Sequence, residues 1–269
     1  MILKKSINKA FYLFLFTHLF LWTLIPSLSN TNLPLDTIEA LAWGSNLDWG
    51  YYKHPPFSAF AVEFFYIIFG NNDWAYYLLS QIFVITSFLI VWKFSYMILE
   101  DKLYSLLAVL ILVSISFYNY KTPEFNVNVS QLPFWALSVY LFWRGLNFNK
   151  RIDWMLFGIF SALGFLSKYL FIYILLSLFI FFIINIKKYS RSITNYILSI
   201  IISFSLLTPH FIWLLNNDFV TIFYGLNRSG FTDYFLINHF KYPAIFLLKQ
   251  IIVLIPFMVL ALVGINLCH

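Results

Sequence analysis

The sequence predicts an all-α membrane protein, a polytopic helical bundle of about eight transmembrane helices with interfacial helices in the first external loop. Of its 269 residues, 61% are hydrophobic and only 10% are charged, whereas soluble domains carry about 25% charged residues. Apolar runs long enough to cross a hydrocarbon core of ~30 Å recur along the whole chain. We attribute the net charge of +6 to loops that orient a multipass protein. The expected partners therefore include membrane lipids and exclude nucleic acid.

Eight apolar runs bounded by charged residues are the predicted spans. They cover residues 10–28, 75–98, 103–119, 129–146, 153–167, 169–186, 194–215 and 243–266. The first run follows a basic start, as a signal peptide does, but it is longer than a typical signal and no small-residue cleavage site follows it. We therefore predict an uncleaved helix. The run at 57–70 is too short and too amphipathic for a span, and we predict that it lies in the membrane interface.

The distribution of basic residues predicts a cytoplasmic N-terminus. Eleven would face the cytoplasm, namely Lys4, Lys5, Lys9, Lys93, Lys102, Arg144, Lys150, Arg151, Lys187, Lys188 and Arg191. Six would face the opposite side, namely Lys53, Lys121, Lys168, Arg228, Lys241 and Lys249. The excess of 11 over 6, which together make the 17 Lys and Arg residues, supports this orientation. Eight of the 11 acidic residues, Asp233 among them, fall on the external side, so we expect any chemistry there.

The segment "PLDTIEALAWG" (34–44) predicts a helix in the first external loop. Pro34 suits the start of a helix, and Gly44 followed by Ser and Asn marks its end. Asp36 and Glu39 are three residues apart, so they share one face of this helix. A carboxylate held there could remove the proton of an acceptor hydroxyl. From position alone, the favoured interpretation is that the pair forms the solvated face of an interfacial helix.

The segment "LDWGYYKHPP" (47–56) interrupts the apolar pattern with polar side chains and with prolines that restrict the backbone. Pro55 and Pro56 limit the backbone, so Lys53 and His54 would point in fixed directions. Cations fixed near carboxylates could stabilise a departing phosphate. The alternative is a lysine that snorkels at the interface beside a structural histidine, and these residues taken alone favour that alternative.

Taken together, "PLDTIEALAWG…LDWGYYKHPPFSA" resembles the first periplasmic loop of bacterial membrane glycosyltransferases of the C superfamily. The closest set is the dolichyl-phosphate-mannose-protein mannosyltransferase-like group, which includes the aminoarabinose transferase that acts on lipid A. In these families an acidic motif follows the first transmembrane helix, and a short basic-Pro-Pro turn comes after it. The resemblance assigns the acidic motif to Asp36 and Glu39. It assigns the turn to Lys53, His54 and the two prolines that follow.

Two later segments extend the resemblance. "GFLSKYLFIYIL" resembles a family segment in which a lysine at a helix end contacts the carrier phosphate, which implies this role for Lys168. "TPHFIWLLNNDFVTIFYGLNR" resembles a later external segment and brings in His210, Asp218 and Arg228. Where the family often places a second acid, "YKTPEFNVNVSQLP" offers Glu124 as a possible second acid.

The resemblance implies a membrane hexosyl- or pentosyltransferase that moves a sugar, with inversion, from a polyprenyl-phosphate donor to an extracytoplasmic lipid, glycan or protein acceptor. Asp36 would be the general base, with Glu39 as the other catalytic acid. The donor phosphate would be held by Lys53, His54, Lys168 and Arg228. Some relatives use a divalent metal ion, for which Glu39 and His54 are the candidate ligands, although their spacing is no recognised metal motif. The resemblance also implies the bacterial inner membrane.

Two rival functions stay open from the sequence. A transporter or flippase of a lipid-linked sugar would place charges near the bilayer midplane, whereas the mid-span positions here are nearly all apolar. An inactive or accessory fragment is the other rival, because family members commonly have several more spans. We therefore treat residues 1–269 as a single transferase-like domain, with C-terminal truncation as an alternative, and place the predicted active site in the loop at 29–73.

Overall fold

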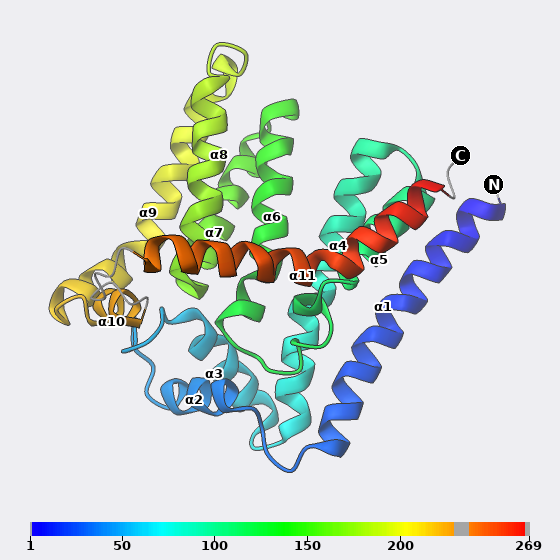
Figure 1. Ribbon diagram of the computed structural model, residues 1–269. Coiled ribbons are helices and arrows are strands. Elements are labelled where there is room, and N and C mark those ends of the chain that lie inside the picture. Colours follow the sequence, from blue (N-terminus) through cyan, green and yellow to red (C-terminus); the bar gives the residue numbers. More distant parts are fainter. Residues whose placement is uncertain (1, 229–236, 267–269) are drawn as a thin grey trace.

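The computed structural model describes residues 2–228 and 237–266 (Figure 1). Within these ranges the chain forms eleven α-helices and three short 3-10 helices and contains no strand. This confirms the all-α class that the sequence predicts. Asp233, one of the predicted external acids, lies outside the described residues.

Four of the described helices are long and apolar enough to cross a membrane. They are α1 (Ile2–Ser29), α4 (Asp73–Leu99), α9 (Ile193–Asn216) and α11 (Asn238–Asn266). Each overlaps one of the predicted spans, and each exceeds the ~20 residues that a perpendicular crossing requires. The chain is therefore an integral membrane protein.

The other four predicted spans are also helical, but the count of eight crossings is not confirmed. They correspond to α5 (Lys102–Val113), α6 (Val127–Phe148), α7 (Arg151–Ser167) and α8 (Ile172–Ile184). With 12 and 13 residues, α5 and α8 reach only ~20 Å, which is less than the hydrocarbon thickness. The predicted run at 103–119 stops early because Asn119 donates its side-chain amide to the carbonyl of Val113. A one-turn 3-10 helix, η1 (Ser116–Tyr118), follows.

Both helices expected in the first external loop are present as α2 (Leu35–Gly44) and α3 (Phe57–Phe69). They lie side by side below the main bundle in Figure 1. Helix α2 begins directly after Pro34 and buries the face formed by Thr37, Ala40 and Gly44. A methyl group on Gly44 would lie 3.2 Å from the Ala59 carbonyl, so the absence of a side chain there lets the two helices approach closely.

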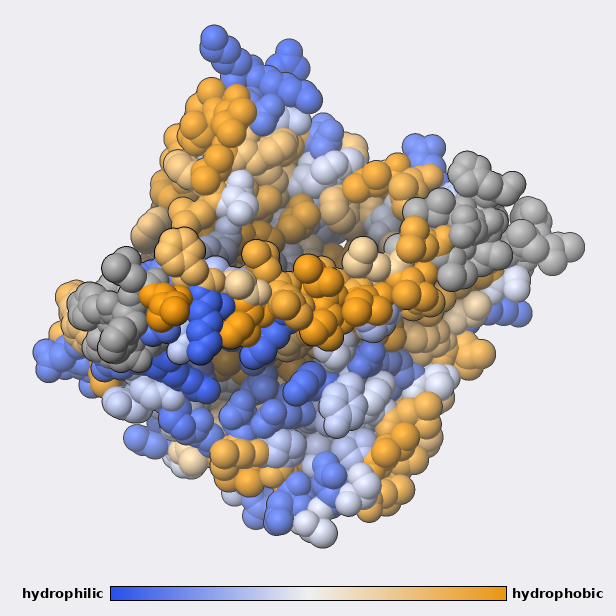
Figure 2. Space-filling view, viewed as in Figure 1, coloured by the Kyte–Doolittle hydropathy of each residue, from blue (hydrophilic) through white to orange (hydrophobic). Residues whose placement is uncertain are grey.

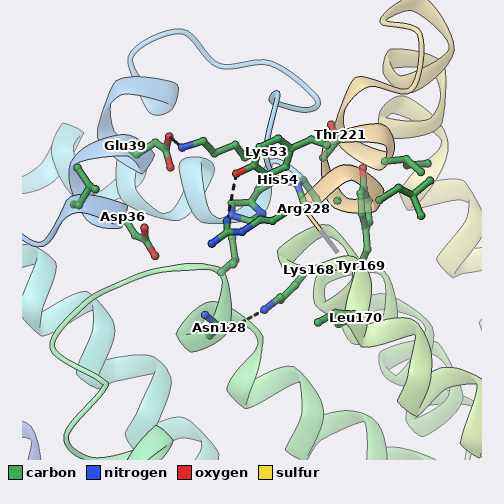
Figure 3. Close-up of a pocket in the computed structure, with 17 residues that line it drawn as sticks. Asp36, Glu39, Lys53, His54, Asn128, Lys168, Tyr169, Leu170, Thr221 and Arg228 are labelled. Carbon is green, nitrogen blue, oxygen red and sulfur yellow. Dashed lines mark hydrogen bonds and ion pairs between the residues drawn. The ribbon is translucent and has the colours of Figure 1, made fainter. Parts of the chain in front are cut away.

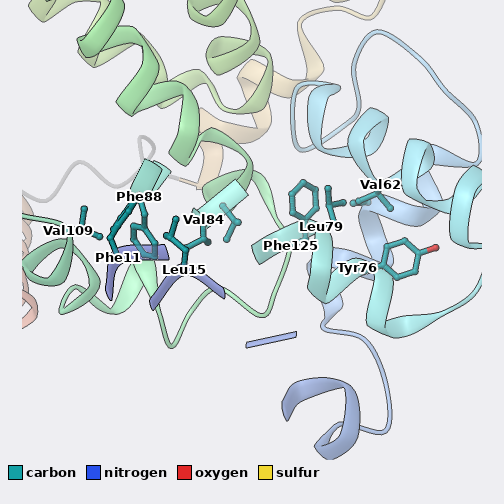
Figure 4. Packing of buried hydrophobic residues seen from close by; sticks show 11 residues of the cluster. Phe11, Leu15, Val62, Tyr76, Leu79, Val84, Phe88, Val109 and Phe125 are labelled. Atoms are coloured by element: carbon teal, nitrogen blue, oxygen red, sulfur yellow. The ribbon is translucent and has the colours of Figure 1, made fainter. Parts of the chain in front are cut away.

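Two apolar clusters hold the molecule together. In the first, Phe11 and Leu15 of α1 pack against Phe88 of α4 and Val109 of α5 (Figure 4). The second joins α6 to α9 around a fully buried Trp154. Within a membrane, such side chains hold helices together by van der Waals packing, because lipid tails are as apolar as the side chains themselves. These clusters fix the frame on which the connection that carries α2 and α3 rests.

The distribution of surface hydropathy agrees with a membrane-embedded body. Figure 2 shows hydrophilic residues at the tip between α8 and α9 and again in the region below α11, with an apolar band between them. The remaining short elements are η2 (Tyr169–Phe171), η3 (Ser190–Ser192) and α10 (Val220–Arg228). Of these, η2 and α10 border the polar region near α2, where the predicted site residues lie.

Candidate active site

A cavity of about 860 Å³ opens among the connection between α1 and α4, the start of α6, the α7–η2 junction and α10 (Figure 3). It is lined by six of the predicted site residues, namely Asp36, Glu39, Lys53, His54, Lys168 and Arg228. We refer to it as the cationic cavity. Glu124 does not line this cavity but borders a neighbouring one. Folding thus gathers residues that are far apart in the sequence into one place.

Asp36 lies in the first turn of α2 with its side chain exposed to the cavity. The side-chain amide of Asn126 donates a hydrogen bond of 3.3 Å to its Oδ2 atom. Within the described residues no hydrogen bond reaches Oδ1, the other oxygen of the carboxylate. Asp36 is therefore oriented by a neighbour while one oxygen stays available to accept a proton.

Glu124, the possible second acid, supports α2 rather than facing the cationic cavity. Its Oε1 atom accepts a hydrogen bond of 3.2 Å from the backbone N–H of Asp36. An anion at this helix end is favourable because the first-turn N–H groups carry partial positive charge. The hydroxyl of Thr37 also donates to the carbonyl of Phe125 at 3.1 Å. The connection before α6 thus sets the position of Asp36.

Glu39 and Lys53 form an ion pair, with 2.6 Å between Oε1 and Nζ. Both side chains are partly exposed, at 28% and 36% respectively. The hydrogen bond to Glu39 raises the pKa of Lys53, so the lysine stays cationic. Unlike Asp36, Glu39 is already engaged with a cation, which makes it the weaker candidate for a base.

His54 directly precedes Pro55 and Pro56 in the sequence. Its ring packs against Trp43 of α2, where the side chain is partly buried. Burial is the main cause that lowers the pKa of His54 to about 4, and the positive charge of Lys168 is the second cause. The imidazole is therefore neutral at neutral pH in the unliganded protein. The sequence led us to expect a second cation beside Lys53, and the structure instead provides a neutral hydrogen-bonding group.

Lys168 and Arg228 bring the remaining positive charge. Lys168 ends α7 in an extended conformation and donates a hydrogen bond from Nζ to Oδ1 of Asn128. Burial, together with the nearby Arg228, lowers the pKa of Lys168. Arg228, in the last turn of α10, is exposed and contacts the Tyr224 hydroxyl at 3.3 Å. Two cations this close would bind an anion between them, since it would relieve their mutual repulsion.

His210, which the resemblance brought in, does not line the cationic cavity. It is fully buried on α9, with Nδ1 2.5 Å from the carbonyl of Trp49 and Nε2 2.8 Å from the hydroxyl of Tyr169. Asp218 follows α9, is exposed and also lies outside the cavity lining. The role of His210 is therefore structural, since it connects the loop at 29–73 to α9 and η2.

Four polar cavity residues were missed by the sequence reasoning, namely Asn128, Tyr169, Thr221 and Tyr224. Thr221 is buried and donates to the carbonyl of Tyr51 at 2.6 Å. Polar side chains of this kind have no fixed sequence spacing. A signal did exist for Tyr169, because it directly follows Lys168, which the resemblance assigns to the donor phosphate.

The candidate metal ligands do not form a metal site. Across residues 2–228 and 237–266, no three His, Cys, Asp or Glu side chains are placed to hold one ion. Glu39 is bonded to Lys53, and a cation next to it opposes the binding of a metal. The residues present do not fit a divalent ion, so we derive no step through one.

A protein-family model described as dolichyl-phosphate-mannose-protein mannosyltransferase matches residues 53–213. The match includes Lys53, His54 and Lys168, whereas Asp36 and Arg228 lie outside it. No curated protein matches the chain, and no solved structure matches it. Because the family match spans more than half of the 269 residues, the chain belongs to the dolichyl-phosphate-mannose-protein mannosyltransferase family of membrane glycosyltransferases.

Proposed function

We propose that this membrane glycosyltransferase moves a sugar from a polyprenyl-phosphate donor to a hydroxyl group of an extracytoplasmic acceptor, with inversion at the anomeric carbon. The observation that carries the proposal is the composition of the cationic cavity. Lys53, Lys168 and Arg228 line it together with the Asp36 carboxylate. A phosphate leaving group needs cations, and an attacking hydroxyl needs a base.

In the proposed step, Oδ1 of Asp36 accepts the proton of the acceptor hydroxyl while that oxygen bonds to the anomeric carbon. The bond between this carbon and the phosphate oxygen breaks, and its electron pair leaves with the phosphate. Lys168 and Arg228 donate charge-assisted hydrogen bonds to the departing phosphate. Attack from the face opposite the leaving group inverts the configuration, as in other displacements assisted by a general base.

The other cavity residues support this step. Glu39 holds the Lys53 ammonium at 2.6 Å, which fixes the direction of the lysine side chain. His54 is neutral and donates a hydrogen bond to the phosphate without adding charge. Asn128 positions Lys168 through the hydrogen bond to Nζ.

We further propose eight crossings in the bacterial inner membrane, in which the short helices α5 and α8 cross together with the 3-10 turns η1 and η2 beside them. The N-terminus would lie in the cytoplasm, and the chain would form one domain with its active site in the 29–73 loop. The clustering of charges supports this topology. Lys53, Lys168 and Arg228, all assigned to the external side, line one cavity. Arg144 and Asp153, both assigned to the cytoplasmic side, form an ion pair of 2.9 Å between α6 and α7.

The location of the cations favours transfer over transport. Lys168 lies at the C-terminal end of α7 and Arg228 in the last turn of α10. A transporter for a lipid-linked sugar would instead need charged groups near the bilayer midplane, at broken helices.

The decisive experiment measures sugar transfer from radiolabelled polyprenyl-phosphate sugars in membranes that express this chain. We expect Asp36→Asn to lower transfer by about 10²–10⁴-fold, the usual contribution of a general base. Asp73→Asn is the matched control, because Asp73 also lies in the first turn of a helix but lines no part of the cationic cavity. Full activity of Asp36→Asn would remove this residue from the mechanism.

The same membranes separate the rival functions. Movement of labelled lipid across sealed vesicles without transfer would favour a transporter. Neither transfer nor movement, at normal expression and with several donors, would favour an accessory role.

A further inference from the structure

A second cavity of about 850 Å³ adjoins the cationic cavity. The two share Asp36, Asn128, Lys168 and Leu170. The rest of the second lining comes from η1, the connection before α6, the following turns of α6, the start of α8 and Gln250 of α11. We name it the aromatic cavity, after Phe117, Tyr118, Trp135 and Tyr173 in its wall. The catalytic carboxylate thus lies on a wall common to two spaces of nearly equal size.

We propose that the aromatic cavity binds the acceptor and that the acceptor is a saccharide, whose hydroxyl reaches Asp36 from this side. The inference rests on the proposed transfer reaction and deepens it by naming the acceptor class. A transferase must bring two substrates to one atom. Asn126, which lines the aromatic cavity, holds Oδ2 of Asp36, and Oδ1 remains for the incoming hydroxyl.

The charges of the two cavities decide which substrate enters which. The cationic cavity sets Lys53, Lys168 and Arg228 against Asp36 and Glu39, three cations against two carboxylates. In the aromatic cavity the charged residues are Lys121, Lys168, Asp36 and Glu124, two against two. A phosphate therefore favours the cationic cavity, and a neutral ligand fits the aromatic cavity.

The polar lining indicates a ligand rich in hydroxyl groups. Asn128, Gln131 and Gln250 present side-chain amides to the aromatic cavity. An amide both donates and accepts hydrogen bonds, as a sugar hydroxyl does. The Oε1 atom of Gln131 accepts from Trp135 at 3.0 Å, which leaves its amino group for a ligand. Gln250 has no hydrogen-bond partner in the described part of the chain.

The aromatic rings complete the saccharide assignment. Ring faces carry partial negative charge and attract the C–H edges of a pyranose. A purely apolar ligand such as a polyprenyl chain would leave the amides and carboxylates of this wall without partners, at a cost in desolvation. The mixture of rings and amides is typical of a pocket that orients a polar ligand on an apolar wall.

The test is direct binding to the purified protein in detergent, measured by saturation-transfer NMR. The probes are a panel of methyl hexosides, farnesyl phosphate and a Ser/Thr-containing peptide. We expect Tyr173→Ala and Gln250→Ala each to weaken hexoside binding by about fivefold, in line with the loss of one ring contact or hydrogen bond. Farnesyl phosphate binding should not change. Tyr12→Ala is the matched control, since Tyr12 is 60% and Tyr173 63% exposed and Tyr12 lines neither cavity.

The outcomes separate this inference from the proposed transfer. Hexoside binding that depends on Tyr173 and Gln250, with no transfer from any donor, supports the saccharide site and contradicts the proposed function. Transfer that occurs only to the peptide overturns the saccharide assignment alone. The assignment is also overturned if the wild type binds no hexoside, or if Tyr173→Ala and Gln250→Ala bind hexosides as tightly as the wild type does. A selective loss of farnesyl phosphate binding in these variants overturns it too, since that would place the donor in the aromatic cavity.

Discussion

The hydroxyl of Tyr169 lies 2.8 Å from Nε2 of His210, at the point where the loop at 29–73 meets the helical bundle. The opposite ring nitrogen faces the carbonyl of Trp49, which can only accept. In the neutral ring Nδ1 therefore carries the proton, and the Tyr169 hydroxyl donates to Nε2. Gly50 reinforces this junction, because a side chain there would clash with the ring of Trp213. One buried histidine thus fastens the loop that carries Lys53 and His54.

We predict that His210→Ala lowers the free energy of unfolding by about 2 kcal/mol or more, because it leaves two buried partners unsatisfied. Tyr169→Phe should cost less, since only one hydrogen bond is lost. Thermal unfolding in detergent measures both. Tyr173→Phe is the control, because its hydroxyl is on an exposed residue. Equal stability of His210→Ala and wild type would contradict the fastening role.

The Glu39–Lys53 pair should matter for ligand binding more than for stability. Exposed ion pairs contribute about 0–1 kcal/mol, so Glu39→Gln and Lys53→Met should unfold near the wild-type temperature. We expect Lys53→Met to weaken farnesyl phosphate binding by about tenfold or more, since a charged hydrogen bond is lost. Glu39→Gln should strengthen it, because one negative charge leaves the cavity. Titration of both purified variants tests this, and a change of the same sign in both would contradict the arrangement.

The lowered pKa of His54 predicts a pH-dependent stability. The folded protein protonates this imidazole near pH 4, against 6.5 for the ordinary side chain. Between these values the unfolded chain binds more protons, so acidification from pH 6.5 towards 4 favours unfolding. His54→Gln removes this contribution. The difference in unfolding midpoint between wild type and variant should therefore change across this window, and parallel curves would contradict the assignment.

Close contact between α7 and α9 predicts a steric effect at Gly158. A methyl group there would lie 2.5 Å from the carbonyl oxygen of Ser199, and backbone cannot move aside as a flexible side chain can. We expect Gly158→Ala to destabilise by about 1–3 kcal/mol, as overpacking does. Gly225→Ala is the matched control, since no atom of residues 2–228 or 237–266 lies within 4 Å of the added group. Unfolding midpoints of the two variants should differ clearly.

Local patterns were sufficient to predict the elements but not their lengths in every case. The helices in 34–44 and near 57–70 followed from Pro34, Gly44 and apolar periodicity, and both are present as α2 and α3, whereas the interfacial position of the second stays a prediction. The run at 103–119 was predicted too long, because the contact that ends α5 comes from Asn119 folding back onto Val113. Such a contact depends on three-dimensional geometry and leaves no periodic signal.

For the candidate site, the sequence was sufficient to identify the residues, but it did not predict their charges or their hydrogen-bond partners. Asp36, Lys53 and Lys168 were identified from motifs, and the fold brings them to one cavity. That Glu124 supports α2, and that His54 is neutral, depends on neighbours far away in the sequence. Charge and hydrogen bonding act through space, so no linear pattern records them.

By itself, the sequence determined that this protein is helical, membrane-embedded and a member of a glycosyltransferase family, because apolar composition and short motifs are local properties. Only the tertiary structure decided that one oxygen of Asp36 accepts no hydrogen bond from the described residues, that Glu39 pairs with Lys53, and that two cavities meet at the same carboxylate. These are relations between distant segments. They exist only once the apolar clusters have fixed where the helix ends and loops lie.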